Sequence, residues 1–197
     1  LSSTGIGDSA LSSLTGLSAL RTLNLEENAS LTLSGVESLR AAMPDCEVLV
    51  SEELFSVQLG DAEFDTDASS VDASGANVRN LDGIERFTAL TQLDLSDNPG
   101  LDIDGLGQMT GLTELILSGC GISGVGELGL SSLVSRDLSD NPELSDIGAL
   151  GLLGSLQTLD LGGTGVTDIP VLADLPRLNT LILTGCEIED FSVLGDF

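Results

Sequence analysis

The sequence predicts an α/β solenoid, a curved stack of short repeats with a parallel β-sheet on its concave face and 3₁₀ or short helical returns on its convex face. Two observations predict it. A nine-residue pattern, apolar at its first, fourth and sixth positions, recurs along the chain, and its fullest form is LTQLDLSDN at Leu90–Asn98. From Ala68 onward its copies start at residues 68, 90, 112, 133, 156 and 178, so the spacing stays between 21 and 23 residues.

The pattern L-x-x-L-x-L-x-x-N is the signature of a leucine-rich repeat. One repeat cannot bury its apolar edge alone, so neighbouring repeats stack and form a continuous core. Successive side chains on a strand point to opposite sides. The fourth and sixth positions therefore face the core, and the third, fifth and seventh positions face solvent. The core is expected to be aliphatic, because aromatic residues make up only 3% of the chain.

Residues 1–50 are predicted to form irregular N-terminal repeats, with one copy of the pattern at Leu20 (LRTLNLEEN). A true α-helix is expected near residues 35–43, because Ser34 and Glu37 have the spacing of a capping box. Pro44 cannot continue that helix. Residues 46–50 (CEVLV) then read as the next strand.

Residues 51–67 interrupt the repeats. Phe55, Val57 and Leu59 alternate with polar residues and are followed by Gly60-Asp61, a turn signal. This segment is expected to be a hairpin or an irregular insertion that protrudes from one edge.

Residues 68–197 hold the regular repeats of about 22 residues, and all three segments are expected to form one solenoid domain. Apolar residues in the connections recur every three residues, which favours 3₁₀ turns. Leu1 and Phe197 fall within incomplete repeats, so the chain is expected to be a fragment or a mature form of a longer protein. Any leader or anchor would then lie outside it.

The composition of the chain excludes several classes of partner and activity. The net charge is −26, with 32 acidic residues against six arginines, so nucleic acid and anionic lipid are poor partners. The acidic charge is therefore interpreted as serving to bind a basic partner, to bind a divalent cation, or simply to keep the chain soluble. No apolar run approaches the ~20 residues of a membrane span. The chain has no histidine and no phosphate-binding loop, so neither catalysis nor a cofactor is expected.

The three cysteines, Cys46, Cys120 and Cys186, are expected to be free thiols. Cys120 and Cys186 occupy the ninth position of repeats that lie three steps apart, about 15 Å at about 5 Å between neighbouring strands. A disulfide requires Cα atoms within about 7 Å.

Repeats of the form LxxLDLSxN followed by xIxDIxxLxxLxx resemble the internalin-type leucine-rich repeats of bacterial surface proteins. Asp168-Ile169 with Leu172 and Leu175 matches that pattern closely. The resemblance is close over residues 68–197 and loose over 1–50, and residues 43–74 also resemble linkers in repeat-rich surface proteins of gut Firmicutes. It implies an extracellular, cell-anchored module that binds macromolecules through its concave face without catalysis. The chain departs from the pattern at Arg136 and at the two ninth-position cysteines.

The predicted ligand-binding residues lie on the concave strands: Asp72, Asp94, Glu114, Ile116, Asp137, Asp160 and Ile182. The aspartates are interpreted either as an acidic surface for a basic protein or cation, or as ordinary solvated residues. The two isoleucines indicate a contact patch or scattered exposure. Because Asp72 and Asp94 are neighbours, the pKa of one carboxyl is expected to rise.

Two further features are unusual. Asp61, Glu63, Asp65 and Asp67 alternate with other residues and form a weak candidate for a calcium site, although the EF-hand spacing is absent. Arg136 replaces a core leucine. Either its stem lies in the core and its charged head reaches solvent, or it pairs with a nearby carboxylate.

The sequence therefore predicts a non-catalytic protein- or glycan-binding module of a bacterial cell-surface or secreted protein. The first alternative is a structural spacer that carries another domain away from the cell wall. A carboxylate-based hydrolase is a less favoured alternative, and Asp72→Asn and Asp137→Asn would test it.

Overall fold

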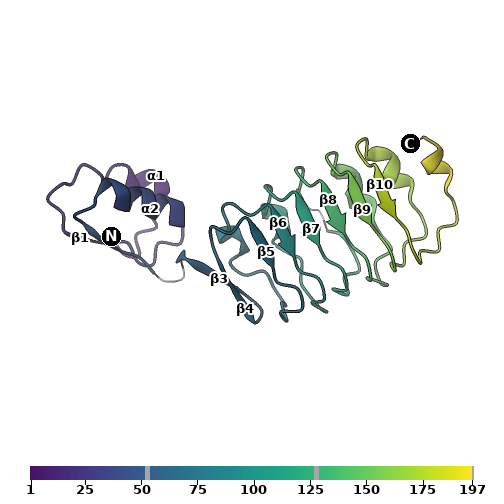
Figure 1. The fold of residues 1–197 in the computed structure, drawn as a ribbon, viewed down its shortest axis with the longest axis horizontal. Coiled ribbons are helices and arrows are strands. Elements are labelled where there is room, and N and C mark those ends of the chain that lie inside the picture. Colours follow the sequence, from purple (N-terminus) through teal and green to yellow (C-terminus); the bar gives the residue numbers. More distant parts are fainter. Residues whose placement is uncertain (52–53, 127–128, 197) are drawn as a thin grey trace.

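The computed structural model describes residues 1–51, 54–126 and 129–196, so Phe197 lies outside the described residues. The elements follow one another along a single long axis (Figure 1). A small N-terminal unit occupies one end, a hairpin follows it, and a longer stack of parallel strands forms the rest. The N-terminal unit contains α1 (Asp8–Leu11), β1 (Thr22–Asn24), α2 (Leu33–Ala42) and β2 (Glu47–Leu49).

The helix predicted near residues 35–43 is present, but it begins at Leu33. Its N-cap is Thr32, whose Oγ1 accepts a hydrogen bond from the Gly35 backbone N–H at 3.1 Å. The capping box predicted at Ser34 and Glu37 is therefore wrong. Asp8 decides the position of the cap, because its carboxylate accepts hydrogen bonds from both the backbone N–H and the hydroxyl of Thr32. The helix α1 that carries Asp8 is a single turn that the sequence did not predict.

Residues 56–65 form an antiparallel hairpin of β3 (Ser56–Leu59) and β4 (Ala62–Asp65). Its turn uses Gly60 at φ +58°, where a side chain would collide with the backbone of residues 76–78. The prediction that this segment protrudes is wrong. Val57 and Leu59 are buried in the core of the larger stack, so the hairpin covers the open end of that core.

The larger sheet has six parallel strands in the order β10-β9-β8-β7-β6-β5, which confirms the predicted parallel sheet. The register is constant, because residues at the same position of each repeat lie opposite one another. Val71, for example, pairs with Leu93, and Leu93 pairs with Leu115. The strands are β5 (Ser70–Asp72), β6 (Gln92–Asp94), β7 (Glu114–Ile116), β8 (Ser135–Asp137), β9 (Thr158–Asp160) and β10 (Thr180–Ile182).

The returns on the opposite side contain short 3₁₀ turns, as the three-residue spacing predicts. Each of the first four buries one apolar residue, namely Ile84, Leu106, Leu150 and Leu172, and these are at most 1% exposed. The turns are η2 (Ile84–Arg86), η3 (Leu106–Gln108), η4 (Gly148–Leu152), η5 (Pro170–Asp174) and η6 (Ser192–Asp196).

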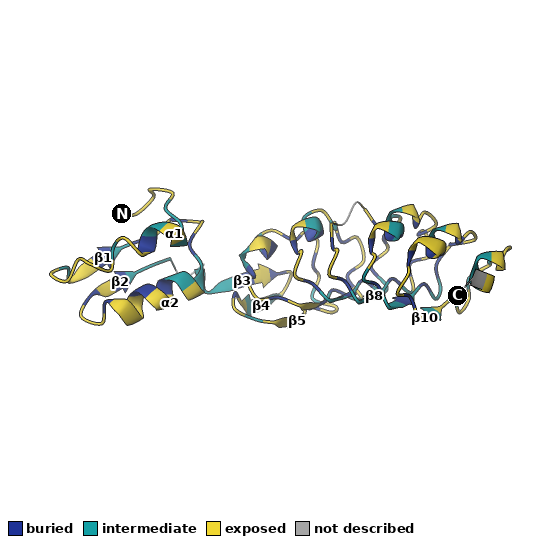
Figure 2. Cartoon of the chain, turned by 90° about the horizontal axis from the view of Figure 1, so that it is seen from above, coloured by how far each residue is buried: buried dark blue, intermediate teal, exposed yellow. Residues whose placement is uncertain are grey.

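The buried apolar residues form two separate clusters in the described part of the chain (Figure 2). One lies between β1, β2 and α2, and the other runs through the six-stranded stack. The two-stranded sheet β1–β2 does not continue into β5. That residues 1–197 form one domain stays a prediction.

Ninth-position asparagines hold neighbouring coils together. Asn98 donates to the carbonyl oxygens of Leu95 and Ala73, at 2.8 and 2.9 Å, and accepts from the Val78 N–H at 2.8 Å. Asn28 and Asn141 make equivalent bonds in their own repeats. Because Asn98 is fully buried, these backbone groups would otherwise lack partners.

The cysteines at the ninth position make only some of the hydrogen bonds that the asparagines make. Cys120 Sγ donates to the Leu95 carbonyl oxygen at 3.0 Å, and Cys186 Sγ donates to that of Leu161 at 2.9 Å. All three cysteines are free thiols. Burial raises the pKa of the Cys120 thiol, so it stays protonated and acts as a donor.

Arg136 lies inside the core, only 2% exposed, at the position where other repeats carry an aliphatic side chain. Of the two predicted arrangements, the one in which its charged head reaches solvent is wrong. No carboxylate of the described residues lies within ion-pair distance, and Glu127 lies outside the described residues, so pairing with a carboxylate stays a prediction. The guanidinium donates to the Val125 carbonyl oxygen at 3.5 Å, while Nε has no partner among the described residues. Burial lowers its pKa to about 10.

Candidate interaction surface

The fifth positions of the repeats form one row across the larger sheet. The register places them side by side in the order Asp72, Asp94, Ile116, Asp137, Asp160, Ile182. Their side chains are exposed or partly exposed on the face opposite the core. The structure thus brings six of the seven predicted concave residues into a single line. Glu114 lies at a third position, on the same face of β7 as Ile116.

The aspartates of this row stabilise the backbone at the end of each strand. In each case Oδ1 accepts a hydrogen bond from the backbone N–H two residues later, as in Asp94 with Ser96 at 2.8 Å. Asp72, Asp137 and Asp160 repeat the arrangement with Ser74, Ser139 and Gly162. This is an Asx turn. Sequence reasoning missed this role, although the recurring D-x-S spacing was a signal for it.

The expected rise in pKa of an aspartate in this row does not occur at Asp72. The hydroxyl of Ser74 and then its backbone N–H donate hydrogen bonds to the carboxylate and lower the pKa of Asp72. These bonds favour the charged form.

Ile116 and Ile182 interrupt the row of aspartates. Neither can accept the hydrogen bond that closes the Asx turn. Ile182 is 38% exposed, and Ile116 is partly exposed between Asp94 and Asp137. The row therefore presents two apolar side chains among carboxylates.

The third positions of the strands form a second row, whose side chains make no Asx-type hydrogen bond to the backbone at the strand ends. Its members are Ser70, Gln92, Glu114, Ser135, Thr158 and Thr180. Glu114 Oε2 accepts a hydrogen bond from Gln92 Nε2 at 3.0 Å. Its carboxylate lies close to Ile116 and keeps its second oxygen available.

The acidic residues of the hairpin do not converge. Asp61 accepts a hydrogen bond from Asn77, and Glu63 accepts one from Ser56. Within residues 1–51, 54–126 and 129–196, no three acidic, histidine or cysteine side chains lie close enough together to hold a metal ion. Calcium binding by these residues and Asp67 stays a weak expectation.

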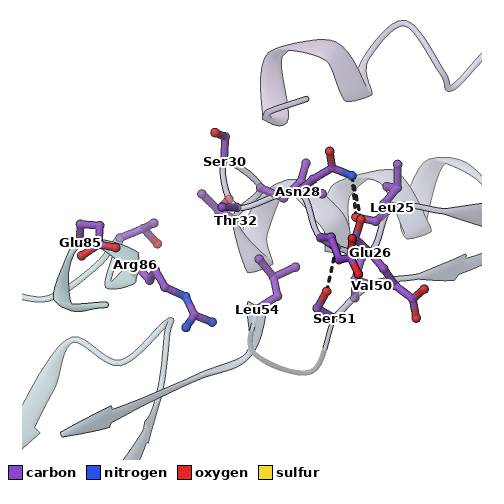
Figure 3. Close-up of a pocket in the computed structure, with 14 residues that line it drawn as sticks. Leu25, Glu26, Asn28, Ser30, Thr32, Val50, Ser51, Leu54, Glu85 and Arg86 are labelled. Atoms are coloured by element: carbon purple, nitrogen blue, oxygen red, sulfur yellow. Dashed lines mark hydrogen bonds between the residues drawn. The ribbon is translucent and has the colours of Figure 1, made fainter. Parts of the chain in front are cut away.

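A cleft that the sequence did not indicate lies between the N-terminal unit and η2 (Figure 3). Its volume is about 800 Å³. One wall is formed by residues 25–32 with Val50 and Ser51, and the other by Glu85, Arg86 and Thr88. These walls come from segments more than thirty residues apart, so no local motif marks the site.

The comparisons with known proteins agree with this architecture. A family model described as leucine-rich repeats in two copies matches residues 155–195, and a second leucine-rich-repeat model matches residues 108–133. The crystal structure of internalin InlF from Listeria monocytogenes is similar with 27% identity and a TM-score of 0.54. The match covers 68% of this chain and 47% of InlF. The chain is a leucine-rich-repeat solenoid that is similar to internalins.

Two further Listeria structures are similar to this chain. Internalin C2 has 29% identity over 64% of this chain and 66% of its own, with a TM-score of 0.49. The functional domain of InlJ has 18% identity over 94% of this chain and 38% of its own, with a TM-score of 0.58. This chain thus spans less than two thirds of each of these proteins. No curated protein matches it.

InlJ is described as including a cysteine ladder. The ninth positions of this chain are instead mixed, and from the repeat at Leu90 onward they are Asn98, Cys120, Asn141, Thr164 and Cys186. Leucine-rich-repeat domains are general protein-interaction modules, and internalin-type proteins are generally non-catalytic. No helix among the described residues is long and apolar enough to cross a membrane.

Proposed function

We propose that this chain is a non-catalytic binding module of a bacterial cell-surface or secreted protein, and that its partner binds the exposed face of β5–β10. The observation that carries the proposal is Ile116. At this position an aspartate would close the Asx turn and stay solvated, as Asp94 and Asp137 do. Isoleucine gives up that hydrogen bond and places an apolar side chain on the surface, which favours a contact.

The surroundings of Ile116 suggest the chemistry of the partner. Asp94 and Asp137 flank it along the row, and Glu114 lies two residues away on the same strand. An apolar centre with an acidic rim suits a partner that offers an apolar group surrounded by hydrogen-bond donors or positive charge. A basic protein and a glycan both meet that description. Because the strands hold these side chains in place before binding, little further ordering is needed.

A structural spacer remains the alternative, and the Asx turns favour it. Four of the six fifth positions carry aspartates that hydrogen-bond the backbone at the strand ends. This structural role explains those aspartates without a binding partner. We propose no hydrolase, because Asp72 and Asp137, the pair considered for that role, lie on strands separated by β6 and β7.

The test is binding to a glycan array and to an array of purified extracellular protein domains. We expect a signal that Ile116→Asp abolishes, because that substitution restores the aspartate row and removes the apolar centre. Leu152→Asp is the matched control, since Leu152 is 72% exposed on η4, away from the sheet. A signal that survives Ile116→Asp and Ile182→Asp would contradict a site on the sheet. Absence of any signal on both arrays would favour the spacer.

A further inference from the structure

We propose that the exposed face of β5–β9 docks an extended protein segment with the pattern Lys-x-apolar-x-Lys, which crosses the strands over Ile116. This inference rests on the proposed function of the sheet and names the partner for it. The fifth positions are arranged symmetrically about Ile116. Asp94 and then Asp72 lie on one side of it, and Asp137 and then Asp160 lie on the other.

Each of these four aspartates offers one carboxylate oxygen to a partner. Oδ1 closes the Asx turn in every case, whereas Oδ2 accepts no hydrogen bond from the described residues. The turns therefore orient the carboxylates before any partner arrives. All residues of these strands and of the turns that follow them are described, namely 68–76, 90–98, 112–120, 133–141 and 156–164.

The spacing of the strands favours an ammonium group over a guanidinium. Neighbouring parallel strands lie about 4.8 Å apart, so the carboxylates of Asp72 and Asp94 repeat at about that distance. Two N–H groups of a tetrahedral ammonium, each with an N···O distance of about 2.8 Å, reach acceptors about 4.6 Å apart. The planar fork of a guanidinium instead fits both oxygens of one carboxylate, and here one of them already closes the turn.

The distance between the two aspartate pairs fixes the spacing of the lysines. Asp137 and Asp160 form the second pair, and the centres of the two pairs lie three strand spacings apart, about 14 Å. In an extended segment, side chains at i, i+2 and i+4 point to the same side, and i and i+4 also lie about 14 Å apart. Lysines at i and i+4 therefore reach the two pairs, and an apolar side chain at i+2 covers Ile116.

The charge of the molecule excludes two other occupants of this face. A second copy of the chain would be repelled, because each copy carries a net charge of −26. A neutral glycan would leave four carboxylates without a counter-charge. At Asp72 the hydrogen bonds from Ser74 lower the pKa, so this carboxylate is charged at neutral pH. A cationic segment with an apolar centre complements the row.

The test is calorimetric titration of the full 197-residue chain with short peptides at about 20 mM salt, where charge pairs are weakly screened. The probe is Gly-Lys-Ser-Leu-Ser-Lys-Gly with both termini blocked. We expect a Kd on the order of 1 mM or tighter. The peptide with arginine in place of both lysines, and the isomer Gly-Lys-Leu-Ser-Ser-Lys-Gly, have the same charge and should each bind at least threefold more weakly. No binding of the probe, or equal binding of all three peptides, would overturn the inference.

Aspartate variants locate the site. Asp94→Asn and Asp137→Asn should each weaken binding of the probe about fivefold or more. Asparagine removes the charge but keeps the Asx turn, because its side-chain oxygen accepts the same hydrogen bond. Asp146→Asn is the matched control, since Asp146 closes the same kind of turn with the Gly148 N–H at 2.9 Å, on the return before η4. Unchanged binding by both sheet variants would contradict the inference.

The peptide and array experiments fail separately. In Ile116→Asp, the probe should lose its advantage over the isomer that carries leucine one position earlier, because the apolar contact is gone. An array partner that requires Ile116 but binds no better to the sheet than to its charge variants would keep the proposed function and overturn this inference alone. Failure of the peptides together with empty arrays would remove both.

Discussion

The two regions of the molecule use the same nine-residue pattern and reach different architectures. In the N-terminal unit the return is the ten-residue helix α2, and the sheet stops after two strands. In the larger stack the 3₁₀ turns are three to five residues long, and six strands join in one register. The core of the first contains nine buried residues, whereas the second core runs through every repeat from residue 57 to residue 178.

This difference shows that a continuous sheet depends on a constant spacing between repeats more than on the nine-residue pattern itself. A helix rises 1.5 Å per residue and is wider than a 3₁₀ turn, so a helical return sets a different distance between coils. Between β2 and β5 the spacing is lost, and the ladder ends there. The β3–β4 hairpin then buries Val57 and Leu59 and covers the exposed end of the larger core, as a terminal cap does in repeat proteins.

The largest effect is expected from Leu59→Ala, which should cost about 4 kcal/mol of unfolding free energy because Leu59 is fully buried. Leu25→Ala in the small core is the matched variant. Hydrogen exchange resolved along the chain should show lost protection in β5–β10 for the first and in β1–α2 for the second. If either variant lowers protection across the whole chain, the two cores unfold as one unit and the comparison between them fails.

Arg136→Leu should stabilise the larger stack alone, by about 3 kcal/mol at pH 7, because it removes a buried charge whose pKa is lowered by burial to about 10. Above pH 10 the folded state releases this proton while the unfolded state keeps it, so wild-type stability from this group rises with pH. The advantage of Arg136→Leu should therefore shrink as the pH rises above 10.

Thermal melts at pH 7 and pH 11 measure this difference. A lower melting temperature for Arg136→Leu at pH 7 would reveal a stabilising interaction of the guanidinium and contradict the prediction.

Asn98→Ala and Asn28→Ala test whether both regions depend on the hydrogen bonds that the ninth-position asparagine makes between coils. Asn98→Ala should cost about 2 kcal/mol, because buried backbone groups of the neighbouring coil lose their partners. Asn28→Ala should cost about 1 kcal/mol, because the neighbouring backbone groups that it bonds are only partly buried. Thr164→Ala is the control at the same repeat position, where the hydroxyl bonds the Leu161 carbonyl and Cys186 Sγ, and it should cost about 1 kcal/mol. Urea unfolding measures all three. A neutral Asn28→Ala would mean that the small unit does not depend on this asparagine.

The smallest effect is expected from calcium. The hairpin acids do not converge on a common point among the described residues, so about 5 mM calcium should leave the melting temperature of the hairpin and the stack unchanged. A rise that Asp65→Asn abolishes, and Asp45→Asn does not, would show that the hairpin binds the ion.

The sequence predicted what the leucine spacing controls and missed what distant contacts control. Strand positions, the parallel sheet, the 3₁₀ returns and the helix all follow from local periodicity. The packing of Val57 and Leu59 depends on residues beyond Val71, and the cap of α2 depends on Asp8, 24 residues earlier. The burial of Arg136 breaks the pattern, and no local rule reveals where its side chain points. The row of concave residues followed from strand alternation, whereas the cleft required the relative placement of two separate segments.

The Asx turns have a consequence for anyone who would use this scaffold to display new binding residues. Randomising the fifth position discards a strand-end hydrogen bond at each of the four repeats that carry aspartate there, and the cost accumulates with each substitution. The third position makes no such hydrogen bond at the strand ends. Its small polar residues are Ser70, Ser135, Thr158 and Thr180. A library confined to those sites could diversify most of the sheet while leaving its scaffold intact.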